Sequence, residues 1–174
     1  MKYLKDQVRS IPNYPKEGII FKDITPILSD PEAFQRAITC LKLLAKEVDF
    51  DLVVAPEARG FIFGATLAHS MGKGFVPIRK EGKLPCETIW EEYALEYGTA
   101  TLEMHKDAIQ KGQKVVIVDD LLATGGTVKA ICNLVERLGG EVVRICCLIE
   151  LPELKGRKTL EGYDVESVIP FDGE

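Results

Sequence analysis

Apolar residues in the first half of the chain follow helical spacing in two segments and form continuous runs in two others. Asp30 can accept hydrogen bonds from the first free N–H groups of a helix, and Pro31 suits the first helical turn, so we expect a helix to begin here. The predicted elements are a helix over 31–48, a buried strand over 52–55, a helix over 60–71 and a strand over 75–78.

The second half of the chain continues the alternation of strands and helices. Residues 100–105 alternate strictly, which predicts a strand open to water on one side. The remaining predicted elements are a fully apolar strand over 115–118, a helix over 128–138 and strands over 142–149 and 165–169. Apolar strands that alternate with helices predict an α/β fold, with a mostly parallel twisted sheet flanked by helices on both faces.

Two segments of the chain have no clean period. Residues 1–28 mix charges with three prolines, and we expect a short helix followed by an extended segment around 18–24. Residues 79–98 carry many charges and three aromatic residues, of which Trp90 and Tyr93 could make either lid contacts or contacts with a second subunit. A long connection of this kind in a compact domain is usually functional or mobile.

The composition limits the class of protein. A length of 174 residues suits one domain spanning 1–174, and the net charge of −5 argues against nucleic-acid binding, which depends on Lys and Arg. The five cysteines lack paired spacing, which favours free thiols in a reducing compartment. Because there is no apolar run of bilayer length and no signal-peptide pattern, we expect a cytoplasmic protein without a membrane partner.

The segment from Val115 to Thr127, VVIVDDLLATGGT, carries the strongest candidate chemistry. Ligands of open α/β sheets bind beyond the carboxyl ends of the strands. The carboxylates of Asp119 and Asp120 can accept hydrogen bonds from two vicinal hydroxyls, as on a ribose. The Thr-Gly-Gly-Thr turn lets backbone N–H groups approach a phosphate, and the following helix directs its positive end to the same place. The segment therefore predicts a pocket for a phosphorylated ribose.

A simpler interpretation is that the two aspartates only cap the helix and the glycines only turn the chain. The combination of all these features in one segment favours the pocket. The segment is not a Walker A element, because no Gly-Lys-Ser/Thr follows, and the GxGxxG dinucleotide fingerprint is absent from it. His69 and His105 lack the spacing of a zinc motif, so we predict no protein ligand for a metal ion.

VVIVDDLLATGGT resembles the phosphoribosyl pyrophosphate motif of the type I phosphoribosyltransferases, and its double-Asp form with LLATGGT is similar to the adenine-specific members. Further segments fall in that family's order and spacing: GIIFKDITPIL, EARGFIFG, RKEGKLP, LEYG, HKDAI and LIELPELKGR. The resemblance covers nearly the whole chain. It implies the type I fold, with a small N-terminal hood over 1–28 and a mobile catalytic loop over 79–98. It also implies transfer of a phosphoribosyl group to adenine, giving AMP and pyrophosphate.

The resemblance also implies roles for individual residues. For phosphoribosyl pyrophosphate, they are Asp119 and Asp120 on the ribose hydroxyls, Ala123, Thr124, Gly125, Gly126 and Thr127 around the 5′-phosphate, and Arg59, Lys80 and Lys83 on the pyrophosphate. For adenine, they are Ile20, Phe21 and Leu151 around the base, Tyr97 closing over it and Glu96 as the acid-base group. A cis peptide near Glu57-Ala58 would shape the loop before Arg59. The family further implies a homodimer, and Mg²⁺ held mainly through the substrate.

The chain departs from the family pattern at two positions, with Ala58 where Ser is common and Lys22 where Arg is common. The first change removes one possible pyrophosphate contact. Two other functions stay open: a transferase for another base, and a non-catalytic regulator that senses phosphoribosyl pyrophosphate. Ala123 favours adenine, because oxopurine enzymes commonly carry Asp at this position. Asp120 also favours adenine, because uracil enzymes commonly lack the second Asp of the pair. The absence of a basic patch and of spare length argues against a DNA-binding regulator.

Overall fold

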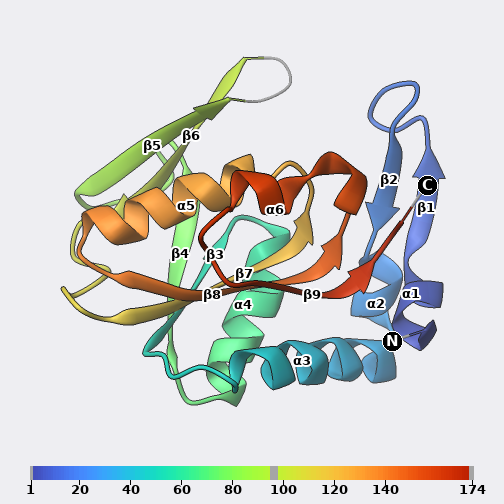
Figure 1. Ribbon diagram of the computed structural model, residues 1–174, viewed down its shortest axis with the longest axis horizontal. Helices are drawn as coiled ribbons and strands as arrows, with labels where there is room; N and C mark the ends of the chain where they lie inside the picture. The colour runs from blue at the N-terminus through green and yellow to red at the C-terminus, as the bar shows by residue number, and fades with distance from the viewer. Residues whose placement is uncertain (1, 95–97, 173–174) are drawn as a thin grey trace.

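A computed structural model describes residues 2–94 and 98–172 of the chain. Within these residues, seven strands form one sheet in the order β5-β6-β4-β3-β7-β8-β9 (Figure 1). The strands are β3 (Leu52–Pro56), β4 (Gly74–Lys80), β5 (Thr88–Ala94), β6 (Thr99–His105), β7 (Lys114–Leu122), β8 (Glu141–Glu150) and β9 (Val165–Pro170). The run from β4 to β9 is parallel, and β5 and β6 form an antiparallel edge.

Helices cover both faces of the sheet, as the sequence predicts. Helices α3 (Pro31–Ala45) and α4 (Arg59–Ser70) lie on one face, and α5 (Gly126–Arg137) lies on the other (Figure 1). Strand β7 runs through the middle of both cores. Its Val116 and Val118 pack on the α3 and α4 side, and Val115 and Ile117 pack on the α5 side, all four fully buried. Two-sided burial explains why this strand is continuously apolar rather than alternating.

Local signals account for where the main helices begin. The Asp30 carboxylate accepts a hydrogen bond from the Ala33 N–H at 2.8 Å, and Pro31 occupies the first turn of α3, so the predicted helix start is confirmed. Helix α4 packs very close to β3, because a Cβ built at Gly64 would lie 2.7 Å from the Ala55 Cβ. Glycine at this position brings the helix that begins at Arg59 against the sheet.

The N-terminal residues form a small unit beside the main sheet. It contains α1 (Lys2–Gln7), the antiparallel hairpin of β1 (Arg9–Pro12) and β2 (Ile20–Asp23), and the short helix α2 (Thr25–Ser29). The C-terminal end of the described chain holds this unit in place. The ring of Phe171 is buried, with the Lys5 ammonium 4.6 Å and the Lys22 ammonium 4.4 Å from its centroid. The short helix and the extended segment expected within residues 1–28 correspond to α1 and β2. We refer to this unit as the N-terminal hood.

The expectation of an irregular connection over residues 79–98 is wrong in part. Strand β4 continues to Lys80, and β5 pairs along its length with β6. The periodicity was hidden because one face of β5 carries Ile89 and Tyr93 with Glu91 between them. Glu91 interrupts the apolar pattern because it accepts hydrogen bonds from α5, the nearest from Asn133 at 2.9 Å.

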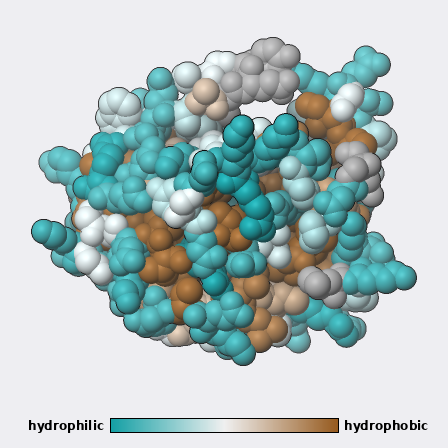
Figure 2. All heavy atoms as spheres, viewed as in Figure 1, coloured by the Kyte–Doolittle hydropathy of each residue, from teal (hydrophilic) through white to brown (hydrophobic). Residues whose placement is uncertain are grey.

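Short helical turns complete the chain between β8 and β9, with η1 (Pro152–Leu154) and α6 (Gly156–Thr159). On the face seen in Figure 2, hydrophilic side chains predominate and apolar residues show in separate patches between them. This surface fits an apolar core that is largely enclosed between the sheet and its helices. Among the described residues, no helix combines the length and apolar character needed to span a bilayer.

We predict that Gly64→Val destabilises the protein by about 2 kcal/mol, because the new side chain would overlap Ala55 and Phe75. The melting temperature should fall by roughly 4–8 °C in a thermal unfolding experiment. Ala65→Val, at an exposed position of the same helix, is the matched control and should change the melting temperature far less. Equal effects of the two substitutions would contradict a close helix–sheet contact.

Candidate active site

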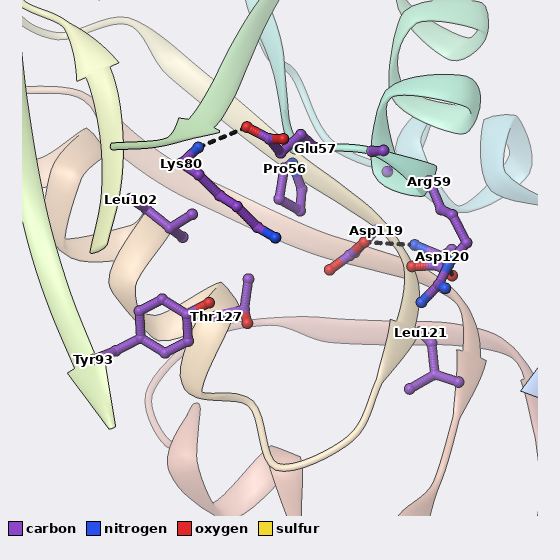
Figure 3. Close-up of a pocket in the computed structure, with 12 residues that line it drawn as sticks. Pro56, Glu57, Arg59, Lys80, Tyr93, Leu102, Asp119, Asp120, Leu121 and Thr127 are labelled. Carbon is purple, nitrogen blue, oxygen red and sulfur yellow. Dashed lines mark hydrogen bonds and ion pairs between the residues drawn. The ribbon is translucent and has the colours of Figure 1, made fainter. Parts of the chain in front are cut away.

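A cavity of about 350 Å³ opens at the carboxyl ends of β3, β4 and β7 (Figure 3). Its lining residues come from these strand ends, the start of α4, strands β5 and β6, and the first turn of α5: Pro56, Glu57, Ala58, Arg59, Gly60, Lys80, Tyr93, Leu102, Asp119, Asp120, Leu121 and Thr127. This is the edge at which parallel sheets bind ligands. The predicted segment 115–127 thus supplies one wall of a real cavity.

Asp119 and Asp120 follow the four buried apolar residues of β7. Both are nearly inaccessible, at 8% and 5% exposure, and the Asp119 carboxylate accepts a hydrogen bond from the Asp120 N–H at 2.8 Å. Burial, followed by the neighbouring charge of Asp120, raises the pKa of Asp119 well above its ordinary value. The pair therefore brings several carboxylate oxygens together in a buried place, where they need hydrogen-bond donors or a positively charged partner.

Arg59 supplies positive charge to this pair from the first residue of α4. Its Nε lies 2.5 Å from Asp120 Oδ2, and Figure 3 shows the side chain directed toward that carboxylate. The guanidinium also lies 5.3 Å from the centroid of the Phe21 ring in β2. The Glu57–Ala58 peptide just before it is cis, as the resemblance implied. Arg59 thus connects the carboxylate pair to the N-terminal hood.

Residues 123–127, which we call the phosphate loop, connect β7 to α5. Gly125 precedes α5 in a left-handed conformation, with φ of 84°, which a side chain would disfavour. The first N–H groups of α5 have no acceptor within the helix, so they are available to an anion at this end. The loop surrounds a second, smaller cavity of about 80 Å³ that shares Asp119, Leu121 and Thr127 with the first.

The two predicted lysines occupy different places. Lys80 lines the main cavity at the end of β4, and its backbone N–H donates to the Glu57 carboxylate at 2.7 Å. Lys83 lies in the exposed turn that follows and does not line the cavity of the described chain. Glu57 also pairs with Arg79, at 3.3 Å from its Nε, so this carboxylate ties the loop after β3 to β4.

The residues predicted for the base lie beside the main cavity rather than in its wall. Ile20 and Phe21 are carried by β2, Ile20 at 39% exposure, and Phe21 makes an edge contact with Tyr14. Leu151 follows β8, and its N–H donates to the Leu122 carbonyl next to the phosphate loop. Glu96 and Tyr97 lie outside the described residues.

Several lining residues were not expected from the sequence as members of a site, among them Glu57, Tyr93 and Leu102. Glu57 could have been found by following the predicted strand at 52–55 past its carboxyl end. Tyr93 was considered only as a lid or subunit contact, and Leu102 only as part of a strand; their place in the cavity depends on the β5–β6 pairing. In the described part of the chain, no group of three or more His, Cys, Asp or Glu side chains could hold a metal ion.

The sequence matches the model of the phosphoribosyl transferase domain over residues 27–172. The matched range includes the carboxylate pair, Arg59 and the whole phosphate loop. The chain belongs to the phosphoribosyltransferase family.

Adenine phosphoribosyltransferases of several bacteria are similar to this chain over nearly its whole length. The enzyme of Lachnoclostridium phytofermentans is 57% identical over 174 residues, which is the full length of both chains. The enzyme of Kosmotoga olearia is 61% identical over 168 residues, 97% of this chain and 99% of the relative.

Solved structures show the same similarity. The adenine phosphoribosyltransferase of Thermoanaerobacter pseudethanolicus superposes with a TM-score of 0.96 at 58% identity, covering 98% of this chain and 99% of that one. The Saccharomyces cerevisiae enzyme, crystallised with an imino-altritol bisphosphate and adenine, gives a TM-score of 0.92 at 43% identity over 96% and 97% of the two chains. The type I fold expected from the sequence is confirmed.

We predict that Asp119→Asn stabilises the unliganded protein at neutral pH. Because the pKa of Asp119 is raised in the fold, the folded chain keeps this proton to higher pH than the unfolded chain, and stability falls as pH rises above about 4. An amide removes that loss, so the melting temperature at pH 7 should rise by roughly 2–4 °C, equivalent to about 1 kcal/mol.

The gain from Asp119→Asn should disappear near pH 3, below the ordinary Asp pKa of about 3.9, where the Asp119 carboxyl is mostly protonated in both the folded and the unfolded chain. Asp120→Asn is the matched control, because it removes the ion pair with Arg59 and should lower the melting temperature instead. A gain of equal size at pH 3 and pH 7 would show that burial of the Asp119 charge is not the cause.

Proposed function

We propose that this protein transfers the 5-phosphoribosyl group of phosphoribosyl pyrophosphate to adenine, forming AMP and pyrophosphate. The observation that carries the proposal is the carboxylate pair of β7 next to a glycine loop that opens α5. These groups complement the two ends of a ribose 5-phosphate: acceptors for the hydroxyls and N–H donors for the phosphate. The adenine phosphoribosyltransferases to which the chain is similar support adenine as the base.

In this proposal the phosphate loop binds the 5′-phosphate, and Asp119 and Asp120 accept hydrogen bonds from the ribose hydroxyls. Arg59 exchanges part of its contact with Asp120 for the pyrophosphate, which needs a positive partner as it leaves C1. Lys80 already faces the cavity, whereas Lys83 would have to move from its exposed turn to contribute charge. The pyrophosphate is therefore held mainly from the ends of β3 and β4.

Mg²⁺ fits this site as a companion of the substrate. Asp119 and Asp120 offer hard oxygen ligands in the cavity, but they are only two carboxylates, and Asp120 is paired with Arg59. Pyrophosphate oxygens and water would complete the coordination sphere. When bound, the ion would neutralise charge on the leaving group.

The chemistry requires a site closed to water, because the ribose C1 becomes cation-like as pyrophosphate departs. The β5–β6 hairpin stands over the cavity and contributes Tyr93 to its wall. We propose that the connection between these two strands closes over the bound substrates, with Tyr97 as a cover. Glu96 in the same connection would take the proton released by the base.

Adenine would bind between the hood and the turn after β8. Phe21 offers an aromatic ring for stacking, Ile20 lies next to it, and Leu151 would cover another side of the base. A transferase for another base remains the second candidate, since the described contacts do not include a base-reading side chain. A non-catalytic regulator is disfavoured by the similarity over full length to enzymes.

We also propose that the protein acts in the cytoplasm as a homodimer. Three of its five thiols are buried and all five are unpaired in the structure, which suits a reducing compartment. Light scattering coupled to size-exclusion chromatography would test the dimer.

The activity is tested by incubating the protein with phosphoribosyl pyrophosphate, Mg²⁺ and one base at a time. We expect AMP from adenine, and formation of nucleotide from hypoxanthine, guanine or uracil at least a hundredfold slower, in an assay read by chromatography. Turnover of another base in preference to adenine would overturn the assigned substrate. Binding of phosphoribosyl pyrophosphate without turnover of any base would instead support the regulator.

We predict that Glu96→Gln lowers kcat by about 100-fold, in the range expected when a general base is removed. The KM for phosphoribosyl pyrophosphate should change by less than threefold, because the phosphate and ribose contacts are elsewhere. Glu92→Gln, an exposed carboxylate in β5, is the matched control and should leave kcat unchanged. An unaltered kcat in Glu96→Gln would remove this residue from the mechanism.

A further inference from the structure

The turn between β8 and β9 packs against the phosphate loop without lining its cavity. Thr159 Oγ1 donates to the Thr124 carbonyl at 2.7 Å, and the Leu151 N–H donates to the Leu122 carbonyl at 2.9 Å. The lining of the small cavity comes entirely from residues 119–128. The turn therefore contacts the loop from outside the space that a ligand would fill.

Two glycines allow this contact to be close. A Cβ built at Gly156 would lie 2.4 Å from the Ala123 carbonyl oxygen, and one built at Gly125 would lie 2.8 Å from the Gly156 carbonyl oxygen. Backbone thus packs on backbone, with no side chain between them. The carbonyl groups of two successive loop residues, Ala123 and Thr124, face the turn.

The direction of these carbonyls fixes the direction of the neighbouring N–H groups. In a planar trans peptide the C=O and the following N–H point in opposite directions. With the carbonyls of Ala123 and Thr124 held toward the turn, the N–H groups of Thr124 and Gly125 point the other way, away from the turn. The same arrangement keeps two carbonyl oxygens away from an anion bound in the loop.

An ion pair between a buried carboxylate and a half-exposed arginine anchors the turn to the sheet. The Glu150 carboxylate, 6% exposed, accepts two hydrogen bonds from Arg157, at 2.7 and 2.9 Å, and a third from Ser167 Oγ. The Arg157 hydrogen bonds keep the pKa of Glu150 below its ordinary value. Arg157 also donates to the Val165 carbonyl, so one guanidinium joins the end of β8 to the start of β9.

We propose that Thr159, Gly156 and the Glu150–Arg157 pair are positioning residues for the 5′-phosphate. They hold the phosphate loop so that its carbonyls face outward and its N–H groups face the ligand, and they do so without touching the ligand. The inference rests on the proposed function, because it takes the phosphate loop as the site of the 5′-phosphate. It assigns a role to residues that line neither of the two cavities.

Thr159→Val tests this role, because it removes the hydroxyl and nearly preserves the shape. We expect the KM for phosphoribosyl pyrophosphate and the Kd for ribose 5-phosphate, measured by calorimetry, to rise about three- to tenfold, which is the usual effect of losing one hydrogen bond. The KM for adenine should stay within twofold. Thr159→Ser keeps the donor and should restore both constants to wild-type values.

Lys158→Ala is the matched control, since Lys158 is the exposed neighbour of Thr159 on the same turn. It should leave the Kd for ribose 5-phosphate unchanged. Gly156→Ala should raise the Kd for ribose 5-phosphate at least as much as Thr159→Val, because the new methyl group would clash with the Ala123 carbonyl oxygen.

Three results would overturn the inference. The Kd for ribose 5-phosphate could be unchanged in Thr159→Val, or it could rise equally in Lys158→Ala. The third is that Thr159→Val weakens the binding of adenine and of ribose 5-phosphate equally and also lowers the melting temperature. A wild-type protein that neither binds ribose 5-phosphate nor forms AMP would contradict the proposed function itself. That outcome is seen before any variant is compared, so the two failures are distinguishable.

Discussion

Burial of two adjacent carboxylates at the end of β7 is the constraint around which the site is arranged. Carboxylates removed from water need a positive partner close by. Arg59 is that partner for Asp120, and it reaches the pair only because α4 begins against the sheet. Gly60 makes this approach possible, since a Cβ there would lie 2.9 Å from the Pro56 ring and 3.0 Å from the Asp119 carboxylate. The start of α4 is therefore fitted to the carboxylates rather than to the core alone.

The order of the strands brings the remaining parts to the same edge. Strand β7 lies between β3 and β8, so the loops that follow these three neighbours converge at their carboxyl ends. The connection after β3 leads to Arg59, the connection after β7 is the phosphate loop, and the connection after β8 carries Leu151 and Thr159. Segments separated by about a hundred residues in sequence become adjacent because parallel strands end together.

The sequence predicted the parallel core and the central motif because both rest on local patterns. Two-sided burial makes β7 continuously apolar, and the helix signals at Asp30 and Pro31 are strong. Strand β5, and with it the pairing to the predicted strand β6, was missed because Glu91, whose acceptor role depends on α5, breaks the apolar alternation of an edge strand. The place of Tyr93 in the cavity could not be predicted either, because it follows from strand pairing and not from neighbours in sequence. The roles of Arg157 and Thr159 depend in the same way on contacts across the fold.

Helix α5 is about 18 Å long, so its two ends contact different parts of the fold. Its first turn borders the phosphate loop, while Asn133 and Arg137, two and three turns further on, hold β5 through Glu91 and the Trp90 carbonyl. If the hairpin moves while α5 stays in place, these polar contacts break. If the contacts survive, the helix must travel with the hairpin and displace the loop at its other end. One helix thus joins the phosphate loop, at its first turn, to strand β5, near its last turn.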